Sequence, residues 1–227
     1  MDQLTSDFFS NPFPGLSDNI EIQNDILSSN LPVVEVPLDI DYKHLLALSK
    51  QIPIDEVIRS TYPYEKTPRL QGWDMQILWS DGTVVPWVKD LYYKVFADAI
   101  PYKSAEGPAE NIKNKLAEYG ITARTCMVSK FSPGGYLRPH RDISLTPRPL
   151  SYFWLPLNSP TGSELKIYPL GTVNINLGCM YLLNQENYTH AVINRSNEDR
   201  YVLVGYLDNP VSDQLLSKIK ASVFDKY

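Results

Sequence analysis

Two stretches of the chain decide the fold: residues Ser129 to Asp142 read SKFSPGGYLRPHRD, and residues His190 to Arg200 read HAVINRSNEDR. They hold two of the three histidines in the sequence. The first stretch places His140 two residues before Asp142, and the second opens on His190. Short runs of strand-forming residues fill the interval between them, so these side chains are predicted to sit on neighbouring strands.

The three side chains suit one metal ion. Side chains alternate along a strand, so His140 and Asp142 are predicted to share a face, about 7 Å apart along the backbone. His190 would reach the same point from a strand that returns beside the first. Two imidazoles and one carboxylate can occupy one face of an octahedral Fe(II) and leave positions open. The spacing therefore predicts a metal site at His140, Asp142 and His190.

Arg200 follows a segment rich in Asn, Ser and Asp, which is typical of a turn. A hairpin centred near Arg195 would put Arg200 opposite His190 on the adjacent strand, where Cβ atoms lie about 5 Å apart. The planar guanidinium matches a carboxylate with two parallel hydrogen bonds. The sequence thus predicts that Arg200 binds the carboxylate of a molecule that also reaches the metal.

These motifs resemble a known family. Ser-x-x-x-Pro-Gly precedes Pro-His-Arg-Asp, a strand over Gly178 to Leu183 precedes His190, and His-x-Val-x-Asn-x-Ser-x-x-x-Arg ends at Arg200. In this they are similar to the Fe(II)/2-oxoglutarate-dependent oxygenases, and within them to the aspartyl/asparaginyl β-hydroxylase group, which includes free-proline cis-hydroxylases. The resemblance covers residues 129 to about 210.

The resemblance implies roles for individual residues. His140, Asp142 and His190 would be ligands of Fe(II), Arg200 would anchor the distal carboxylate of 2-oxoglutarate, and Ser129 would be a second contact to that carboxylate. It also implies the activity: a dioxygenase that uses O2 and 2-oxoglutarate, hydroxylates an amino acid or a peptide side chain, and releases succinate and CO2.

Two further residues are candidates for substrate contact. Arg138 has the same strand parity as His140, so it is predicted to line the mouth of the site, where it would meet an acidic substrate. Relatives often carry a basic residue on the strand after the His-x-Asp strand. Here that strand reads SYFW and ends at Trp154, whose ring is the second candidate.

The second half of the chain predicts a mainly β fold with flanking helices. Eight short strands separated by turn residues indicate a double-stranded β-helix, or jelly roll, with a turn at Gly134-Gly135. The predicted strands cover residues 122–131, 137–142, 151–157, 164–168, 172–177, 179–184, 189–194 and 200–207.

The rest of the chain is predicted to buttress this core. Residues 1–30 form a polar N-terminal extension, 31–120 a buttress of helices and strands in the same domain, 121–210 the catalytic core, and 211–227 a C-terminal helix. Asp41 is a candidate helix N-cap and Gly120 a candidate C-cap. Within these ranges, strands are predicted at 31–36 and 72–79, and helices at 41–51, 87–100, 111–119 and 213–224.

Composition limits the class of partner. The formal net charge of −5 argues against binding to a nucleic-acid backbone, which needs clustered Lys and Arg. No apolar run reaches the length of a membrane span, and the first residues lack the pattern of a signal peptide. The two cysteines form no disulfide framework. These features predict a cytoplasmic protein with no nucleic acid or membrane as partner. The resemblance, together with the moderate size of the chain, implies a free amino acid or a short peptide as substrate.

Two other functions stay open on the sequence. A cupin-like metal enzyme would share the barrel, but cupins usually begin their ligand set with His-x-His, whereas this chain has His-x-Asp. A non-catalytic jelly-roll binding protein would hold no stoichiometric Fe(II) and release no succinate. Arg148 and Arg195 are alternative anchors for a carboxylate. His44 is predicted to be an ordinary helix histidine, because no second ligand is spaced to join it.

Overall fold

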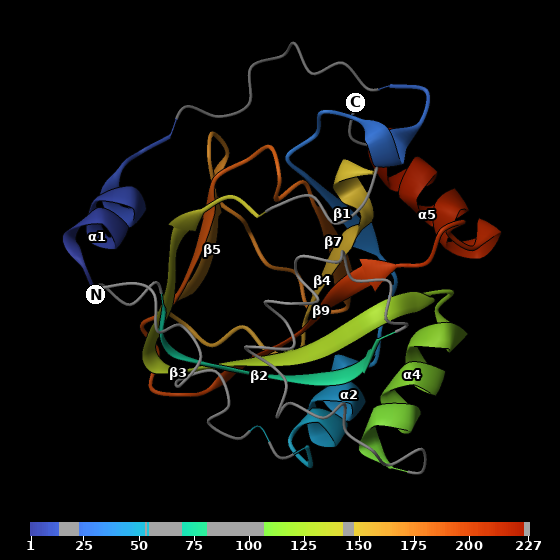
Figure 1. The fold of residues 1–227 in the computed structure, drawn as a ribbon, viewed down its shortest axis with the longest axis horizontal. Helices are drawn as coiled ribbons and strands as arrows, with labels where there is room; N and C mark the ends of the chain where they lie inside the picture. Colours follow the sequence, from blue (N-terminus) through green and yellow to red (C-terminus); the bar gives the residue numbers. More distant parts are fainter. Residues whose placement is uncertain (14–22, 53, 55–69, 81–106, 143–147, 225–227) are drawn as a thin grey trace.

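The computed structural model describes residues 1–13, 23–52, 54, 70–80, 107–142 and 148–224. Their strands form one antiparallel sheet in the order β1-β7-β4-β9-β3-β8-β5-β6, with β2 paired to β3. The sheet curls into a half-barrel (Figure 1), so the fold is the mainly β jelly-roll class that the sequence predicts. The strands are β1 (Val33–Pro37), β2 (Leu70–Ser80), β3 (Ala123–His140), β4 (Tyr152–Pro156), β5 (Ser163–Ile167), β6 (Gly171–Thr172), β7 (Cys179–Leu183), β8 (His190–Asn194) and β9 (Arg200–Leu207).

Strand β3 joins the two halves of the sheet, a first half of β1, β7, β4 and β9 and a second half of β8, β5 and β6. Its first part pairs with β9 and its last part with β8, so residues predicted as two strands form one. The predicted turn at Gly134-Gly135 is wrong: these residues lie in an irregular stretch of β3, where the register against β2 shifts between Gln71 and Trp73. A Cβ on Gly135 would lie 2.5 Å from the carbonyl oxygen of Gly72. Glycine therefore lets the two strands stay paired through the bend.

Strands β4, β7 and β9 are buried on both faces over most of their length, which explains their nearly continuous apolar sequence. On β9, Val202 and Val204 point into the cluster between the two halves, whereas Leu203 packs with the helices. On β4, Trp154 belongs to the inner cluster and Phe153 to the helix side. Strand alternation thus tells which side chains face the interior of the half-barrel.

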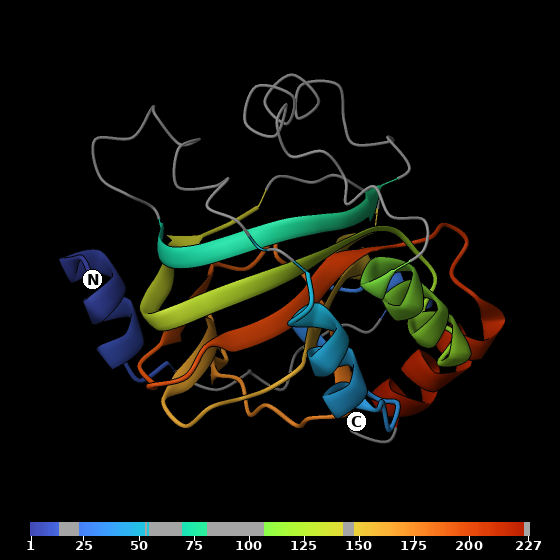
Figure 2. The ribbon, with the colours of Figure 1, turned by 90° about the horizontal axis from the view of Figure 1, so that it is seen from below.

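Three helices cover the outer face of the first half, and one helix lies on the other side of the molecule (Figures 1 and 2). The Asp41 side chain caps its helix by accepting from the backbone N–H of His44, as predicted. Among the helices of the described ranges, none is both long and apolar enough to cross a membrane. The helices are α2 (Tyr42–Ser49), α4 (Pro108–Glu118), α5 (Asp213–Phe224) and, on the other side, α1 (Gln3–Ser10).

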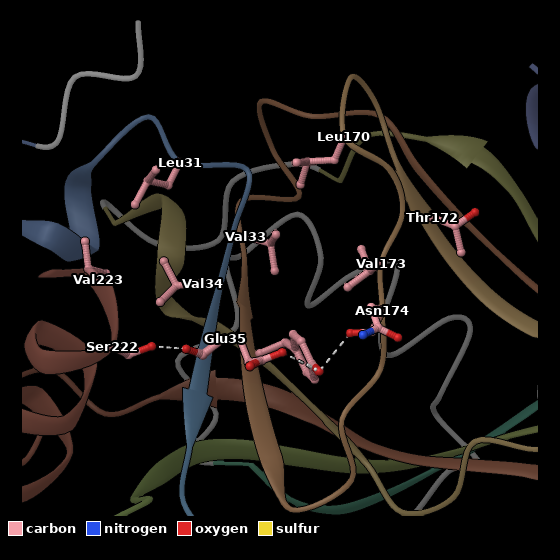
Figure 3. A pocket seen from close by; sticks show the side chains of 11 residues that line it. Leu31, Val33, Val34, Glu35, Leu170, Thr172, Val173, Asn174, Ser222 and Val223 are labelled. Carbon is pink, nitrogen blue, oxygen red and sulfur yellow. Dashed lines mark hydrogen bonds between the residues drawn. The ribbon is translucent and has the colours of Figure 1, made fainter. Parts of the chain in front are cut away.

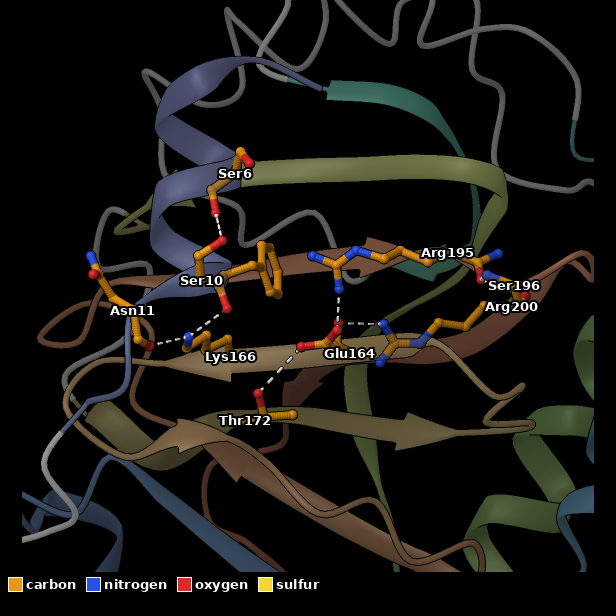
Figure 4. Close-up of polar contacts among 11 residues, drawn as sticks. Ser6, Ser10, Asn11, Glu164, Lys166, Thr172, Arg195, Ser196 and Arg200 are labelled. Carbon is orange, nitrogen blue, oxygen red and sulfur yellow. Dashed lines mark hydrogen bonds and ion pairs between the residues drawn. The ribbon is translucent and has the colours of Figure 1, made fainter.

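Helix α1 was not predicted, and it packs on the outer face of β3 and β8. Phe9 joins Tyr136 and Ile193 in a small cluster there. Lys166, on β5, donates from Nζ to the carbonyl oxygens of Phe9 and Asn11, at 3.0 and 2.6 Å (Figure 4). The buried ammonium of Lys166 thereby donates to carbonyl oxygens at the end of α1, where a helix supplies no N–H partner of its own.

Other differences from the predictions concern pairing and length. Strands β8 and β9 do not pair with one another, because β3 lies between them. Of the strand predicted at 172–177, only Thr172 is in β6. The segment 26–28 forms a short 3-10 helix within the predicted polar extension. The helix predicted at 87–100 lies outside the described residues.

Candidate metal centre

His140, Asp142 and His190 converge. One ligand atom from each lies within 4.8 Å of the others. Asp142 bridges the two imidazoles: its Oδ1 is 3.3 Å from Nε2 of His140, and its Oδ2 is 3.7 Å from Nε2 of His190. The ring centroids of the histidines are 4.3 Å apart. Two imidazole nitrogens and a carboxylate on one side of a point are the donor set that suits Fe(II) and similar divalent ions.

Both histidines have their other ring nitrogen committed to the backbone. Nδ1 of His140 lies 2.6 Å from the carbonyl oxygen of Arg138, and Nδ1 of His190 lies 3.3 Å from that of Tyr188. A carbonyl oxygen only accepts, so Nδ1 is the donor in each contact, and Nε2, on the side of Asp142, is the ring nitrogen left for a metal ion. Such backbone partners are the usual means of orienting a metal-binding histidine.

His190 is held in its neutral, metal-binding form. Burial, and to a lesser extent the neighbouring His140, lowers the pKa of His190 to about 4. Asp142 opposes this shift, as does the contact with the Tyr188 carbonyl. The neutral imidazole keeps a lone pair for a cation, which is the state that ligation requires.

A bulge, rather than simple alternation, aims His140 at His190. Leu137 pairs with Val192 and His140 pairs with His190, so one strand advances three residues while its partner advances two. The extra residue brings both Leu137 and His140 to the inner face. Arg138 therefore does not share the face of His140 as predicted. It turns toward α1 instead, with Nε 3.9 Å from the Asp2 carboxylate.

Asp142 lies beyond the end of β3, which ends at His140. The prediction that one strand carries both ligands is thus wrong in detail, although the two side chains do meet. A backbone hydrogen bond of 3.0 Å, from the N–H of Asp142 to the carbonyl of Gln185, fixes the carboxylate beside the histidines. The site is assembled from the end of β3, the residues after it, and the start of β8.

Arg200 is a buried cation inside the half-barrel. It is 1% exposed and pairs across the strands with Phe131, not with His190 as predicted. Its Nη1 donates to the carbonyl oxygen of Glu164 at 3.0 Å, and its Cζ lies 5.0 Å from the ring centroid of Trp154. Burial lowers the pKa of Arg200 to about 9, while the Glu164 carboxylate opposes this shift. Burial of the guanidinium charge therefore costs free energy in the folded state.

Two nitrogens of Arg200, Nε and Nη2, are buried and have no hydrogen-bond partner among the described residues. They are the adjacent pair on one edge of the guanidinium, the edge that binds a carboxylate with two parallel bonds. A buried donor left unpaired costs about 1–3 kcal/mol, more when it is charged. An anion that bound this edge would remove that cost, so the residues present fit a carboxylate ligand.

Ser129 lies on the same wall as Arg200. Ser129 and Phe131 are two residues apart on β3, and their partners on β9 are Val202 and Arg200. Ser129 and Arg200 therefore both face the interior of the half-barrel. Ser129 is buried, and its Oγ accepts from Nε1 of Trp73 at 2.5 Å. Trp73 was not singled out from the sequence; only its aromatic character in a predicted strand marked it.

The alternative basic residues lie elsewhere. Arg195 forms an ion pair with Glu164 at the surface and covers the ring of Phe9 (Figure 4). Arg148 lies 4.0 Å from the Asp25 carboxylate. Neither is buried as Arg200 is. His44 is exposed on α2, as an ordinary helix histidine would be.

A cavity of about 290 Å³ opens between β1 and the segment 170–174, at the two edges of the curled sheet (Figure 3). Its wall is mixed: Val33 and Val173 are apolar, whereas Glu35 and Asn174 are polar. The Tyr181 hydroxyl donates to Glu35 there, at 2.9 Å. The cavity lining contains none of the three candidate metal ligands, so this cavity is not the metal site.

Solved structures similar to this chain include Fe(II)/2-oxoglutarate oxygenases. A prolyl-4-hydroxylase from Pseudomonas putida is 14% identical with a TM-score of 0.43, over 78% of this chain and 92% of its own. A viral collagen prolyl hydroxylase from Paramecium Bursaria Chlorella virus-1, in complex with 2-oxoglutarate, is 11% identical with a TM-score of 0.43, over 78% and 96%.

A cupin domain from Bordetella pertussis is 22% identical with a TM-score of 0.28, over 37% of this chain and 80% of its own. No protein-family model matches the sequence. No curated protein matches it either. With identities and TM-scores this low, the function has to be argued from the residues of the site.

Proposed function

We propose that this protein is an Fe(II)- and 2-oxoglutarate-dependent dioxygenase of the aspartyl/asparaginyl β-hydroxylase-like group. It hydroxylates an amino acid or a peptide side chain and releases succinate and CO2. His140, Asp142 and His190 bind the metal, Arg200 and Ser129 bind the 2-oxoglutarate carboxylate, and O2 is the oxidant.

One observation carries the proposal: a half-barrel that holds a two-histidine, one-carboxylate cluster also buries Arg200, whose Nε and Nη2 find no hydrogen-bond partner in the described part of the chain. His190 shares its strand face with Val192, and Arg200 shares its face with Val202. Both valines belong to the inner cluster. A molecule that chelates a metal through one end and presents a carboxylate at the other would use both features.

The residues of the chain have separate tasks. The bond from His140 Nδ1 to the Arg138 carbonyl keeps the proton off Nε2, and the contact of His190 with Tyr188 does the same. Arg200 orients the co-substrate through Nε and Nη2, the two nitrogens that no described residue engages. The inner cluster around it excludes water, which strengthens each charged contact. When bound, Fe(II) and 2-oxoglutarate supply the oxidation of the substrate C–H bond.

The substrate class is the less constrained part of the proposal. A free amino acid or a short peptide carrying a carboxylate or the matching amide follows from the resemblance of the motifs. Arg138 was a candidate contact for that group, and its ion pair with Asp2 of α1 now competes with such a role. Trp154 is buried against Arg200, and this contact supports a place for its ring beside the co-substrate.

The alternatives differ in measurable ways. A cupin-like enzyme would turn over without 2-oxoglutarate, and a binding protein would neither retain stoichiometric Fe(II) nor release succinate. The Asp142 carboxylate between the two Nε2 atoms favours the dioxygenase, since it completes the two-histidine, one-carboxylate set.

A substrate screen tests the proposal. Protein loaded anaerobically with Fe(II) is mixed with 2-oxoglutarate, O2 and a panel of free amino acids and short peptides, and succinate is measured. We expect succinate release to rise with at least one acidic or amide-bearing substrate, and the product mass to rise by one oxygen atom. Protein that binds neither Fe(II) nor 2-oxoglutarate, under any of these conditions, would refute the dioxygenase assignment.

A further inference from the structure

Two tryptophans contact the proposed carboxylate-binding residues without belonging to the metal site: Trp154 contacts Arg200, and Trp73 contacts Ser129. Trp154, on β4, lies with its ring centroid 5.0 Å from Cζ of Arg200. Phe131, on β3, lies at 6.0 Å from the same atom. Trp73, on β2, stacks on Phe131 with centroids 6.0 Å apart and planes 17° from parallel. The guanidinium therefore lies among aromatic faces that attract a cation.

The contacts leave Arg200 with one usable edge. The Glu164 carbonyl takes Nη1, and the ring of Trp154 covers the guanidinium. Nε and Nη2 keep their protons unshared among the described residues. These contacts restrict the rotamers of the Arg200 side chain before a ligand arrives. Ligand binding therefore costs less side-chain conformational entropy. Trp154 is thus placed to keep the Nε–Nη2 edge of the Arg200 guanidinium oriented for a ligand.

The second tryptophan acts on Ser129. An indole N–H can only donate, so the 2.5 Å contact makes the Ser129 oxygen the acceptor. The hydroxyl proton of Ser129 must then go to a different partner. Diagonal neighbours on paired strands lie about 7–8 Å apart, which is the placement of Ser129 relative to Arg200. One carboxylate group between them can accept from both.

We propose that Trp73 and Trp154 are positioning residues for 2-oxoglutarate. Trp73 engages the Ser129 oxygen so that its proton points at the co-substrate carboxylate, and Trp154 holds the Arg200 guanidinium in plane for the same group. This inference rests on the proposed function, because it takes 2-oxoglutarate as the anion. It adds two residues, from strands β2 and β4, that touch neither the metal nor the reacting atoms.

The chain offers a matched control for Trp73. Trp79 lies on the same strand, and its Nε1 also donates, to the carbonyl oxygen of Ala123 at 2.7 Å. Trp79 packs against the outer cluster with the helices, whereas Trp73 packs against the inner one. Trp73→Phe and Trp79→Phe each remove one indole donor and keep a ring. Only the first should change binding of the co-substrate.

The test measures binding of 2-oxoglutarate and of succinate by calorimetry, with metal-free and anaerobic Mn(II)-loaded protein. We expect Trp73→Phe to weaken 2-oxoglutarate binding by roughly five- to tenfold, the effect of one hydrogen bond. Ser129→Ala in the Trp73→Phe background should then add little further loss, because both changes remove the same oriented donor. Mn(II) affinity should be unchanged in these variants. Trp79→Phe should bind as the wild type does.

Trp154 has its own readout. Binding of 2-oxoglutarate beside its ring should change the tryptophan fluorescence of the wild type, and Trp154→Phe should lose most of that change. Trp154→Phe should bind 2-oxoglutarate more tightly than Trp154→Leu, since a phenyl ring still covers the guanidinium.

The outcomes separate the two proposals. If the wild type binds 2-oxoglutarate and releases succinate, but Trp73→Phe behaves as Trp79→Phe does, the positioning role is wrong and the dioxygenase stands. Additive losses from Ser129→Ala and Trp73→Phe would also overturn the Trp73 part. Equal affinities of Trp154→Phe and Trp154→Leu would overturn the Trp154 part. If the wild type binds no 2-oxoglutarate, with or without Mn(II), the proposed function itself fails.

Discussion

At the scale of single residues, the role of Arg200 can be tested most directly. Its guanidinium is buried, and Nε and Nη2 have no hydrogen-bond partner within the described ranges, so a bound anion would satisfy both donors. Arg200→Ala should weaken 2-oxoglutarate binding by roughly 100-fold or more, the effect expected of a desolvated bidentate ion pair. Arg200→Lys keeps the charge without the fork, so it should bind more weakly than wild type but better than Arg200→Ala.

Titration of 2-oxoglutarate into anaerobic Fe(II) protein, followed by its charge-transfer absorbance, checks this prediction. Arg195→Ala is the control, because Arg195 pairs with Glu164 at the surface. Wild-type affinity in Arg200→Ala would move the anchor to another arginine. Iron affinity should hardly differ among these variants, since Arg200 is not in the ligand cluster.

The three histidines give a second comparison at this scale. His190→Ala removes one proposed metal ligand, the Nε2 atom of His190. The other ring nitrogen, Nδ1, faces the Tyr188 carbonyl. The substitution should abolish stoichiometric binding of Fe(II), and of Mn(II), Co(II) or Ni(II) in its place. His44→Ala, on exposed helix surface, should bind metal as wild type does. Metal content after gel filtration measures both, and retention of one Fe(II) by His190→Ala would contradict the assignment.

At the scale of elements, Lys166 fixes helix α1 to the sheet. Its Nζ donates to the Phe9 and Asn11 carbonyls and lies 4.5 Å from the ring centroid of Phe13. Lys166→Met should cost about 1–3 kcal/mol, since two hydrogen bonds to a charged group are lost. The first residues should then be cut faster in limited proteolysis.

Lys115→Met is the control for this prediction, because Lys115 forms a local surface ion pair with Glu118 on the same helix, α4. Its unfolding midpoint in denaturant should stay close to that of wild type, since an exposed ion pair contributes about 0–1 kcal/mol. Equal proteolysis of Lys166→Met and wild type would mean that the aromatic contacts alone hold α1.

At the scale of the whole molecule, ligand binding should stabilise the fold. The metal ligands come from β3, the residues after it and β8, and the anion site comes from β9, so bound ligands cross-link distant segments. At a free concentration of 100 times Kd, each ligand adds about 2.7 kcal/mol. For a chain of this length the melting temperature should rise by roughly 5–10 °C.

Thermal unfolding with Mn(II), with and without 2-oxoglutarate, measures the effect. The Asp142→Ala variant should show no shift with Mn(II), because the carboxylate between the two imidazoles is gone. A wild-type protein whose melting temperature ignores both ligands would speak against a cross-linking site.

The sequence by itself determined the local features of this protein. The alternating and continuous apolar runs predicted most strands, the spacing of His140, Asp142 and His190 predicted the cluster, and Asp41 predicted a helix start. These features depend on neighbours a few residues apart, through strand and helix periodicity and capping. The motif around Arg200 marked an arginine that is the only buried one in the part of the chain that the structure describes.

Only the tertiary structure decided the pairing. Gly72 against Gly135 keeps β3 continuous where a turn was predicted, and the bulge before His140 turns this side chain inward and Arg138 outward. The insertion of β3 between β8 and β9 places Arg200 opposite Phe131. A strand's register and its neighbours are set by contacts between residues far apart in the chain, which local periodicity does not encode. For the same reason Trp73, distant in sequence from Ser129, became visible as its partner only in the folded chain.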